Sequence, residues 1–201
     1  LTAEQGAAPI LAGAEDRQTL LPSWSENGLL AVYDTAAQAY LFIDPLGGEA
    51  ARFPNQTGQQ GAWRPDGDAF LAAEIFYLNA NVSPELANLE SLAASHLILF
   101  DLESQQTEDL TPGDGVEDAM PVYSPDGNFL AFARKYLDLR RWSPGRQLWI
   151  AQTSSRDARQ LTDNPVYNHF DFAWSPAGDQ IAFVRFNQSV LSRPPEIWYY
   201  D

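Results

Sequence analysis

A short pattern recurs four times along the chain and constrains the fold more than any other feature of the sequence. Its fullest copy, at residues 123–133, reads Tyr-Ser-Pro-Asp-Gly-Asn-Phe-Leu-Ala-Phe-Ala: an aromatic residue, a turn and an alternating apolar strand. Related copies begin at Trp63 and Trp174, and a more divergent copy begins at Trp24. Repetition of this kind is typical of a protein assembled from similar structural units.

The turn inside the pattern has a direct chemical explanation. In Ser-Pro-Asp-Gly, Ser124 can hydrogen-bond the turn backbone, Pro125 fixes its own φ, and Gly127 accepts a positive φ. We therefore expect a hairpin in which one strand ends at Tyr123 and the next begins at Asn128.

The strand after the turn is apolar on both sides. Alternation puts Phe129, Ala131 and Ala133 on one face, and residues 130, 132 and 134 (Leu, Phe and Arg) on the other. This pattern predicts a strand that lies between two neighbouring sheets. It also predicts that the four motif aromatics pack between sheets rather than stack on a ligand.

The predicted fold class is all-β, a β-propeller of four-stranded antiparallel blades in one domain over residues 1–201. The first two motif aromatics are 39 residues apart (24 to 63), close to the roughly 40–50 residues of a propeller blade. The expected strands, from the axis outward, are 20–25, 29–33, 39–44 and 50–53 in blade one; 61–63, 69–77, 96–101 and 106–110 in blade two; 119–123, 128–135, 147–152 and 158–162 in blade three; and 170–174, 180–185 and 196–201 in blade four.

The last blade is one strand short, and the N-terminal segment offers a candidate for it. Leu11 precedes Trp24 by the same 13 residues that separate Leu110 from Tyr123 and Leu161 from Trp174. A strand at about 7–13, centred on 9–12, could pair with blade four and close a four-bladed ring. The alternative is that the four units are an arc of a larger propeller.

Three insertions, at 79–95, 137–146 and 187–195, interrupt the repeat at the same place, between the second and third strands of a blade. They therefore emerge on one face, and insertions gathered on one face of a repeat protein often mark its binding surface. The alternative is that these loops tolerate insertions and have diverged without a binding role. In the first insertion, Ser83 and Pro84 predict the start of a helix that places Leu86 and Leu89 on a shared face.

The second insertion is a basic island in an acidic protein. It contains Arg140, Arg141, Trp142 and Arg146, and Arg and Trp are enriched at binding hot spots. An acidic or carboxylate-bearing partner would suit it. The alternative is that Trp142 packs against blade three while the arginines are solvated. The candidate binding residues are thus Arg140, Arg141, Trp142, Arg146, Leu86 and Leu89.

The composition and net charge of the chain narrow the classes of partner that it could bind. The 201 residues carry a formal net charge of −15, which argues against nucleic acid and against an anionic membrane surface. No apolar run reaches the roughly 18 residues of a membrane span. The chain contains no cysteine, so thiolate chemistry and disulfides are excluded.

Residues for catalysis or metal binding are sparse. The two histidines, His96 and His169, lack a paired ligand spacing. Asp114, Glu117 and Asp118 form an acidic cluster that does not match a calcium loop, so we expect a solvated loop there. His169 and Asp171 could line the central channel. We expect no metal, no cofactor and no catalysis within these residues.

The repeated aromatic-Ser-Pro-Asp-Gly turn with its Leu-Ala-Phe or Ile-Ala-Phe strand resembles the TolB-type β-propeller repeat, a WD40-like family. The outer-strand ending Gln-Leu-Thr at 160–162, its echo Asp-Leu-Thr at 109–111, and the Trp-centred strands at 148–150 and 197–199 fit the same family. The resemblance implies a docking platform of the bacterial periplasm or cell surface, or the non-catalytic propeller of a serine peptidase.

The leading functional hypothesis is a non-enzymatic scaffold module, periplasmic, cell-surface or secreted, that binds a protein or peptide on the insertion-bearing face and can assemble into a larger complex. The first alternative is a substrate-gating propeller of a peptidase or hydrolase whose catalytic domain lies outside this chain. A saccharide-binding propeller is a weaker alternative, in which channel aromatics would stack on sugars.

Overall fold

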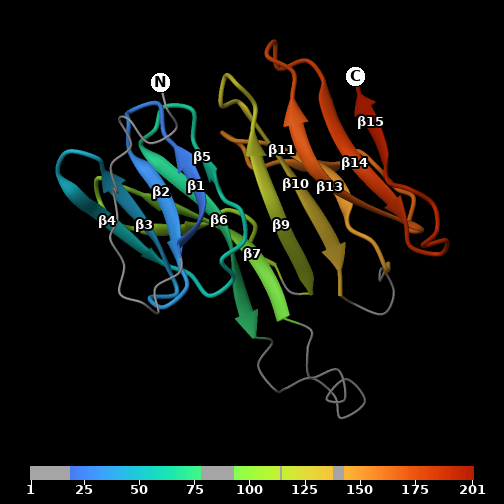
Figure 1. The fold of residues 1–201 in the computed structure, drawn as a ribbon. Coiled ribbons are helices and arrows are strands. Elements are labelled where there is room, and N and C mark those ends of the chain that lie inside the picture. Colours follow the sequence, from blue (N-terminus) through green and yellow to red (C-terminus); the bar gives the residue numbers. More distant parts are fainter. Residues whose placement is uncertain (1–18, 78–92, 114, 138–142) are drawn as a thin grey trace, which may run out of the picture.

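A computed structural model describes residues 19–77, 93–113, 115–137 and 143–201, which form strands joined by turns and loops (Figure 1). The fifteen strands of this part lie in three sheets, and all neighbouring strands but one pair are antiparallel. No helix among the described residues is long and apolar enough to span a membrane. The predicted all-β class is confirmed.

Blade one is a complete four-stranded meander. Its strands follow one another in the order of the chain: β1 (Thr19–Trp24), β2 (Leu30–Asp34), β3 (Ala39–Asp44) and β4 (Gly48–Pro54).

Blades two and three are also four-stranded, and they share one continuous sheet. Blade two consists of β5 (Ala62–Trp63), β6 (Ala69–Tyr77), β7 (Ala93–Asp101) and β8 (Thr107–Asp109). Blade three consists of β9 (Val116–Tyr123), β10 (Phe129–Tyr136), β11 (Gln147–Gln152) and β12 (Ala158–Gln160). A single parallel bridge, Ser95 with Glu117, joins β7 to β9.

Blade four has three described strands, β13 (Tyr167–Trp174), β14 (Ile181–Asn187) and β15 (Glu196–Tyr200). None of the sheets in the described part closes on itself. The predicted strand at 9–12 lies outside the described residues, so ring closure and total blade number stay predictions.

Most strand boundaries fall within three residues of those predicted, and β3, β6 and β11 match at both ends. β7 corrects the first insertion, because the strand begins at Ala93 rather than His96. Ala94 and Ser95 are buried there, and the Ser95 hydroxyl donates to the Asp118 carbonyl at 2.7 Å. The helix predicted to begin at Ser83 lies outside the described residues up to position 92. Ala93, which would share a face of that helix, is in β7.

The motif turn has the predicted geometry. The Gly127 N–H donates to the Ser124 carbonyl at 2.9 Å, and Gly127 has a φ of 72°. The Ser124 hydroxyl donates to Asp126 at 2.6 Å and accepts the Phe129 N–H at 2.9 Å. The same turn bond and the same positive φ recur at Gly28, Gly67 and Gly178.

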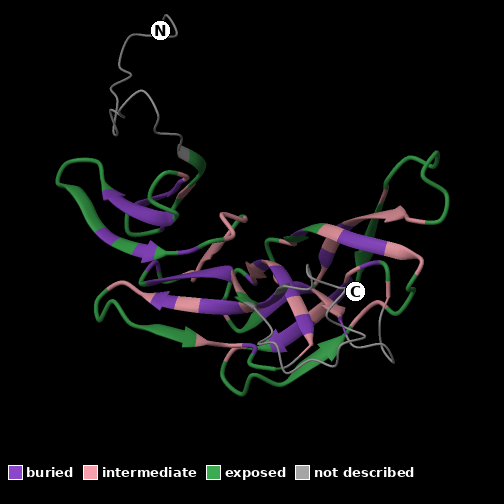
Figure 2. Ribbon diagram, turned by 90° about the horizontal axis from the view of Figure 1, so that it is seen from below, coloured by how far each residue is buried: buried purple, intermediate pink, exposed green. Residues whose placement is uncertain are grey.

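The hydrophobic core lies between successive sheets rather than inside one of them. Leu130 and Phe132 pack toward blade two, whereas Ala131 and Ala133 pack toward blade four. A third cluster joins blades one and two through rings that include Phe42. Buried positions accordingly follow the strands in Figure 2. The prediction of a strand apolar on both faces is confirmed.

The indole groups of two motif tryptophans form hydrogen bonds to the preceding blade. The indole N–H of Trp63 donates to the Ser23 carbonyl at 3.0 Å, and that of Trp174 donates to the Val122 carbonyl at 3.2 Å. Each acceptor is the residue just before the motif aromatic of the preceding blade. Trp24, in blade one, is 57% exposed. The expected blade-to-blade packing is therefore observed for Trp63 and Trp174.

The inner strands share a feature that the sequence did not indicate. Leu21, Met120 and Asp171 have φ values of 56°, 55° and 51°, and each precedes its motif aromatic by three residues. Strand pairing shifts at the same points in β1, β9 and β13, which marks a β-bulge.

Gly127→Ala should lower the free energy of unfolding by about 1–2 kcal/mol, because alanine must adopt the left-handed backbone that glycine tolerates. The added Cβ would meet Pro65 only at ordinary contact distance, so the strain is conformational. Urea denaturation measures the loss. The matched control is Gly113→Ala, where a Cβ meets no atom within 4 Å. Equal losses in both variants would contradict this account of the turn.

Candidate functional site

The face predicted to bind a partner is the end of the sheets where second strands finish and third strands begin. The C-terminal ends of β6, β10 and β14 all lie at this end of the molecule, so the three insertions leave from one face (Figure 1). Arg146 is described there, whereas the other predicted binding residues, Leu86, Leu89, Arg140, Arg141 and Trp142, lie outside the described residues.

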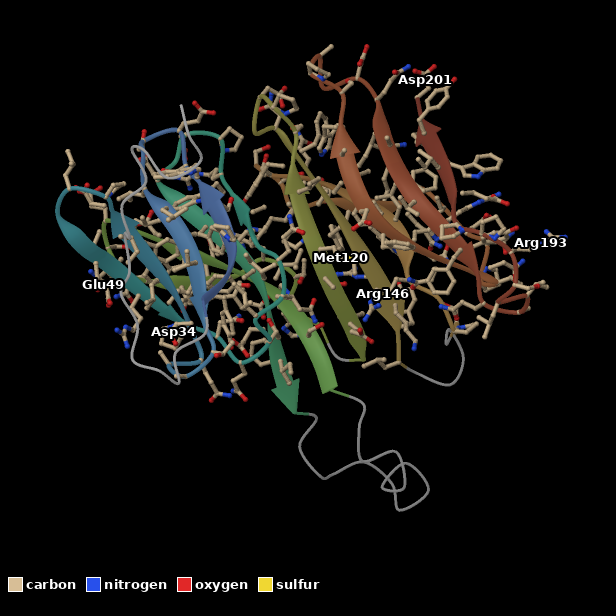
Figure 3. All side chains as sticks on the ribbon, in the orientation of Figure 1. Asp34, Glu49, Met120, Arg146, Arg193 and Asp201 are labelled. Atoms are coloured by element: carbon tan, nitrogen blue, oxygen red, sulfur yellow. The ribbon has the colours of Figure 1, made fainter. Side chains whose placement is uncertain are left out.

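Arg146, labelled in Figure 3, contacts blade four through its backbone and blade three through its guanidinium. Its guanidinium donates to the Glu117 carboxylate. Its backbone N–H donates to the Asn168 side chain at 2.9 Å, and its carbonyl accepts the His169 backbone N–H at 3.0 Å. Its Nε is buried without a hydrogen-bond partner in the described part of the chain. The backbone of this arginine therefore joins blade three to blade four, whereas its guanidinium is paired inside blade three.

Two other arginines occupy the same position in successive blades, eleven residues after the motif aromatic. Arg134 lies 5.0 Å from the Trp149 ring centroid, and Arg185 lies 3.8 Å from that of Trp198. Arg185 also contacts the Tyr167 ring at 4.1 Å, and its Nε donates to Glu196 at 2.9 Å. The repeated position of the arginine is visible in the sequence. Its contact with a tryptophan of the adjacent third strand is visible only in the structure.

The acidic cluster at 114–118 is not a solvated loop, which corrects the sequence prediction. Glu117 and Asp118 are in β9, and Asp118 is fully buried. Arg134 donates to both Asp118 oxygens, each at 2.7 Å. Burial raises the pKa of the Asp118 carboxyl, and the guanidinium opposes that rise. The inner strand extends to this point because the paired arginine satisfies the buried carboxylate. Asp114 is outside the described residues.

Neither histidine forms part of a reactive group. His169 is 1% exposed, and its Nδ1–H donates to the Arg146 carbonyl at 2.9 Å. Burial lowers the pKa of His169, so this histidine is held neutral. His96 bridges the Asp109 carboxylate, at 2.7 Å, and the Gly113 carbonyl, at 2.8 Å. Asp171 is exposed in the bulge of β13, whereas His169 is buried within blade four and does not line an open channel.

A concave region lies on the opposite face, where the motif turns gather. A pocket of about 470 Å³ is lined by all four motif aromatics and by Arg64, among others. The Arg64 guanidinium is paired with Asp66. The indole N–H groups of Trp63 and Trp174 are taken up by the preceding blade, so these side chains serve packing first. Burial raises the pKa of Tyr123 to about 12, so its phenol stays protonated at neutral pH.

The arrangement offers ion pairs, stacked guanidinium groups and aromatic surface. No group of three or more His, Asp or Glu side chains that could hold a metal ion occurs among the described residues.

Comparison with known proteins now adds to these features. The model of the dipeptidyl peptidase IV (DPP IV) N-terminal region matches residues 89–190, just over half of the chain. The chain belongs to this family. The family is a propeller domain of peptidases, which agrees with the meander blades and with the resemblance to TolB-type repeats.

Sequence relatives and a solved structure support the same fold. An uncharacterized protein of Agrobacterium fabrum, Atu1656, is 25% identical over 86% of this chain and 52% of its own length. A probable dipeptidyl-aminopeptidase B of Emericella nidulans is 33% identical over 52% of this chain and 12% of its own length. TolB from Acinetobacter baumannii superposes with a TM-score of 0.62 at 17% identity, covering 96% of this chain and 42% of the other. This chain thus has a TolB-like propeller fold.

The chain spans about half the length of the Agrobacterium relative and 12% of the fungal one.

Asp118→Asn should lower the free energy of unfolding by about 3–5 kcal/mol, because it leaves the Arg134 charge uncompensated in a buried setting. The matched control is Glu108→Gln, which removes the exposed ion pair with Arg156 and should cost less than about 1 kcal/mol. Guanidinium denaturation at pH 7 compares the two. Similar losses would show that the Asp118 pair is no more important than a surface pair.

The lowered pKa of His169 predicts a pH dependence of stability. The folded chain binds the His169 proton less tightly than the unfolded chain, so the stabilisation is complete above the ordinary pKa of about 6.5. It should be lost as the pH falls through the folded-state value. His169→Asn should flatten the stability profile below pH 6.5 in urea denaturation. An unchanged profile would mean that other groups cause the acid sensitivity.

Proposed function

We propose that this chain is a non-catalytic interaction module that binds a protein or peptide at the face from which the second-to-third-strand connections leave. The observation that carries the proposal is that β6, β10 and β14, which precede the three insertions, all end at that face. Binding surfaces of repeat proteins concentrate where insertions share one side.

Arginine–aromatic contacts in the second and third strands that lead to this face support the proposal. Arg134 and Arg185 each stack on a tryptophan, and the neighbouring carboxylates hold them in place. A rigid, stacked guanidinium favours recognition of carboxylates. The residues proposed to contact the partner are Arg140, Arg141 and Trp142, and the backbone of Arg146 joins blades three and four next to this insertion.

A second candidate function has comparable support. The family is named for the N-terminal region of a peptidase, and the fungal relative is a probable dipeptidyl-aminopeptidase. The chain would then be a propeller that controls substrate access to a catalytic domain outside residues 1–201. A Gly-x-Ser-x-Gly nucleophile motif downstream in the parent gene would favour this function. A parent gene without any hydrolase domain would exclude it.

We propose an extracytoplasmic location, in the periplasm, at the cell surface or in the medium of a bacterial host, in keeping with the TolB-like fold. Fractionation of the native host, with antibodies to this chain, tests the location directly. Recovery in the cytoplasm alone would contradict it.

The triple variant Arg140→Ala/Arg141→Ala/Trp142→Ala should reduce partner capture at least tenfold, because it removes the basic and aromatic groups of the proposed surface. Cross-linked partners captured from an envelope fraction by the immobilised chain are quantified by mass spectrometry. The matched control is Arg156→Ala/Arg159→Ala, which removes the same charge from the opposite turn and the outer strand of blade three. Melting temperatures should change by only a few degrees. Undiminished capture by the triple variant would rule out this face.

A further inference from the structure

A pocket lies between the outer halves of blades two and three. Its volume is about 300 Å³, at the lower end of the range for small-molecule sites. Its walls come from β10, β11, β12 and the turn before β12 in blade three, and from the segment that follows β8 in blade two. Both blades have all four strands among the described residues, so the pocket lies inside the repeat and not at an end of the chain.

One position of the repeat accounts for the pocket. It is the third-strand residue that pairs with the second-strand partner of the motif aromatic. This position holds Phe100 in blade two and Ala151 in blade three. It holds Ile43 in blade one and Tyr200 in blade four. Blade three therefore has a methyl group where each of the other three blades has a large side chain.

Blade two shows how a ring fills this position. The Phe100 ring is 2% exposed and stacks on Phe42 and Phe53 of the preceding blade, with centroid distances of 5.4 and 5.2 Å. In blade three, Ala151 faces blade two, and the residue that pairs with it in β12 is also an alanine, Ala158. An apolar cavity of about 150 Å³ is enough to admit benzene, so the pocket has room for a phenyl ring.

The pocket is also positively charged, although the protein is acidic. Arg134 and Arg156 line it, and none of the described residues that line it is acidic. Arg134 is held by both oxygens of the buried Asp118 carboxylate. Arg156 reaches across to Glu108 of blade two in an ion pair that is about half exposed on each side. Exposed pairs are weak, so the Arg156 guanidinium can pair with a second carboxylate at the rim of the pocket.

The turn that carries Arg156 is fixed by hydrogen bonds. The Arg156 N–H donates to the Gln152 carbonyl at 2.8 Å, and Arg156 has a φ of 63°. Thr153 donates its N–H to the Asn128 carbonyl at 2.9 Å and its hydroxyl to the Gly127 carbonyl at 2.6 Å. This end of the pocket is therefore preformed, which lowers the entropy lost when a ligand binds.

We propose that this pocket binds a small aromatic carboxylate, a molecule with one phenyl ring and a carboxylate on a short chain. The ring lies beside Ala151, in the place that Phe100 fills in blade two, and contacts Leu110 and Leu130. The carboxylate pairs with Arg156 at the rim. The site lies between two blades and takes a small molecule, so the proposal does not depend on the protein partner proposed above.

The probe is 3-phenylpropionate, titrated into the full chain at pH 7 and followed by amide chemical shifts in NMR. Saturable shifts should appear at Leu110, Ala151 and Ala158, with a dissociation constant in the millimolar range or tighter, as expected for a ligand of this size. The neutral analogue 3-phenylpropanol should bind several-fold more weakly because it lacks the charge. Propionate, which lacks the ring, should bind at least tenfold more weakly.

Ala151→Phe tests the ring position from the protein side. The new ring should fill the pocket as Phe100 fills the equivalent position, so binding of 3-phenylpropionate should fall at least tenfold while the melting temperature stays the same or rises. The matched control is Ala50→Phe, which places the same side chain at an exposed position of β4 in blade one. This control should leave binding unchanged.

Arg156→Gln tests the charged end. It should weaken the binding of 3-phenylpropionate several-fold and leave the binding of 3-phenylpropanol unchanged. The control is Arg159→Gln, because Arg159 pairs with Ile150 and its side chain lies on the other side of the sheet from Ala158.

Four results would overturn the proposal. They are the absence of saturable shifts at the pocket, equal binding of the charged and neutral probes, undiminished binding to Ala151→Phe, and failure of Ala151→Phe to fold. The last result would mean that the chain itself already fills this space.

Discussion

Burial of apolar side chains between successive sheets is the interaction on which the rest of the structure depends. Each middle strand is apolar on both faces, so no blade can satisfy its own hydrophobic surface. Leu130 and Phe132 need blade two, and Ala131 and Ala133 need blade four. The turns, the indole bonds and the buried ion pair fix the geometry of blades that this burial has already brought together.

The motif made much of this predictable. Tight turns have local chemical rules, so the sequence predicts a positive φ at Gly127, and alternation around Phe132 predicts burial on both faces of the strand. The start of β7 and the burial of Asp118 were not predictable in the same way. A carboxylate in a stretch with Asp114 and Glu117 has the local pattern of a loop, and only the distant Arg134 makes it suitable for a strand. The candidate site is less determined still, since most of its predicted residues lie in insertions that no repeat constrains.

Arginines and aromatic rings have a double role in this protein. At Arg134 and Arg185, ring contacts join the second and third strands of a blade, and ion pairs with Asp118 of the inner strand and Glu196 of the third strand hold the guanidinium groups in place. Arg146 links blades three and four through its backbone, while its guanidinium pairs with Glu117 inside blade three. Such contacts restrict side-chain motion, which would reduce the entropy lost if a partner binds this face as proposed. Membership of the dipeptidyl peptidase IV N-terminal region family is consistent with such a rigid platform, whether it captures a partner or screens a substrate.

The residue with a left-handed backbone in each inner strand changes which face of the sheet its neighbours occupy. Asp118 and Tyr123 are five positions apart, so a regular strand would turn them to opposite sides of the sheet. The bulge at Met120 adds one residue, and both instead face the same neighbouring blade, opposite Arg134 and Leu130. The inner strand is thus two half-strands out of phase by one residue. Losing the extra residue would leave a regular strand with both side chains still on one side, whereas removing the bulge while keeping the residue would exchange the inside and the outside of everything on one side of it.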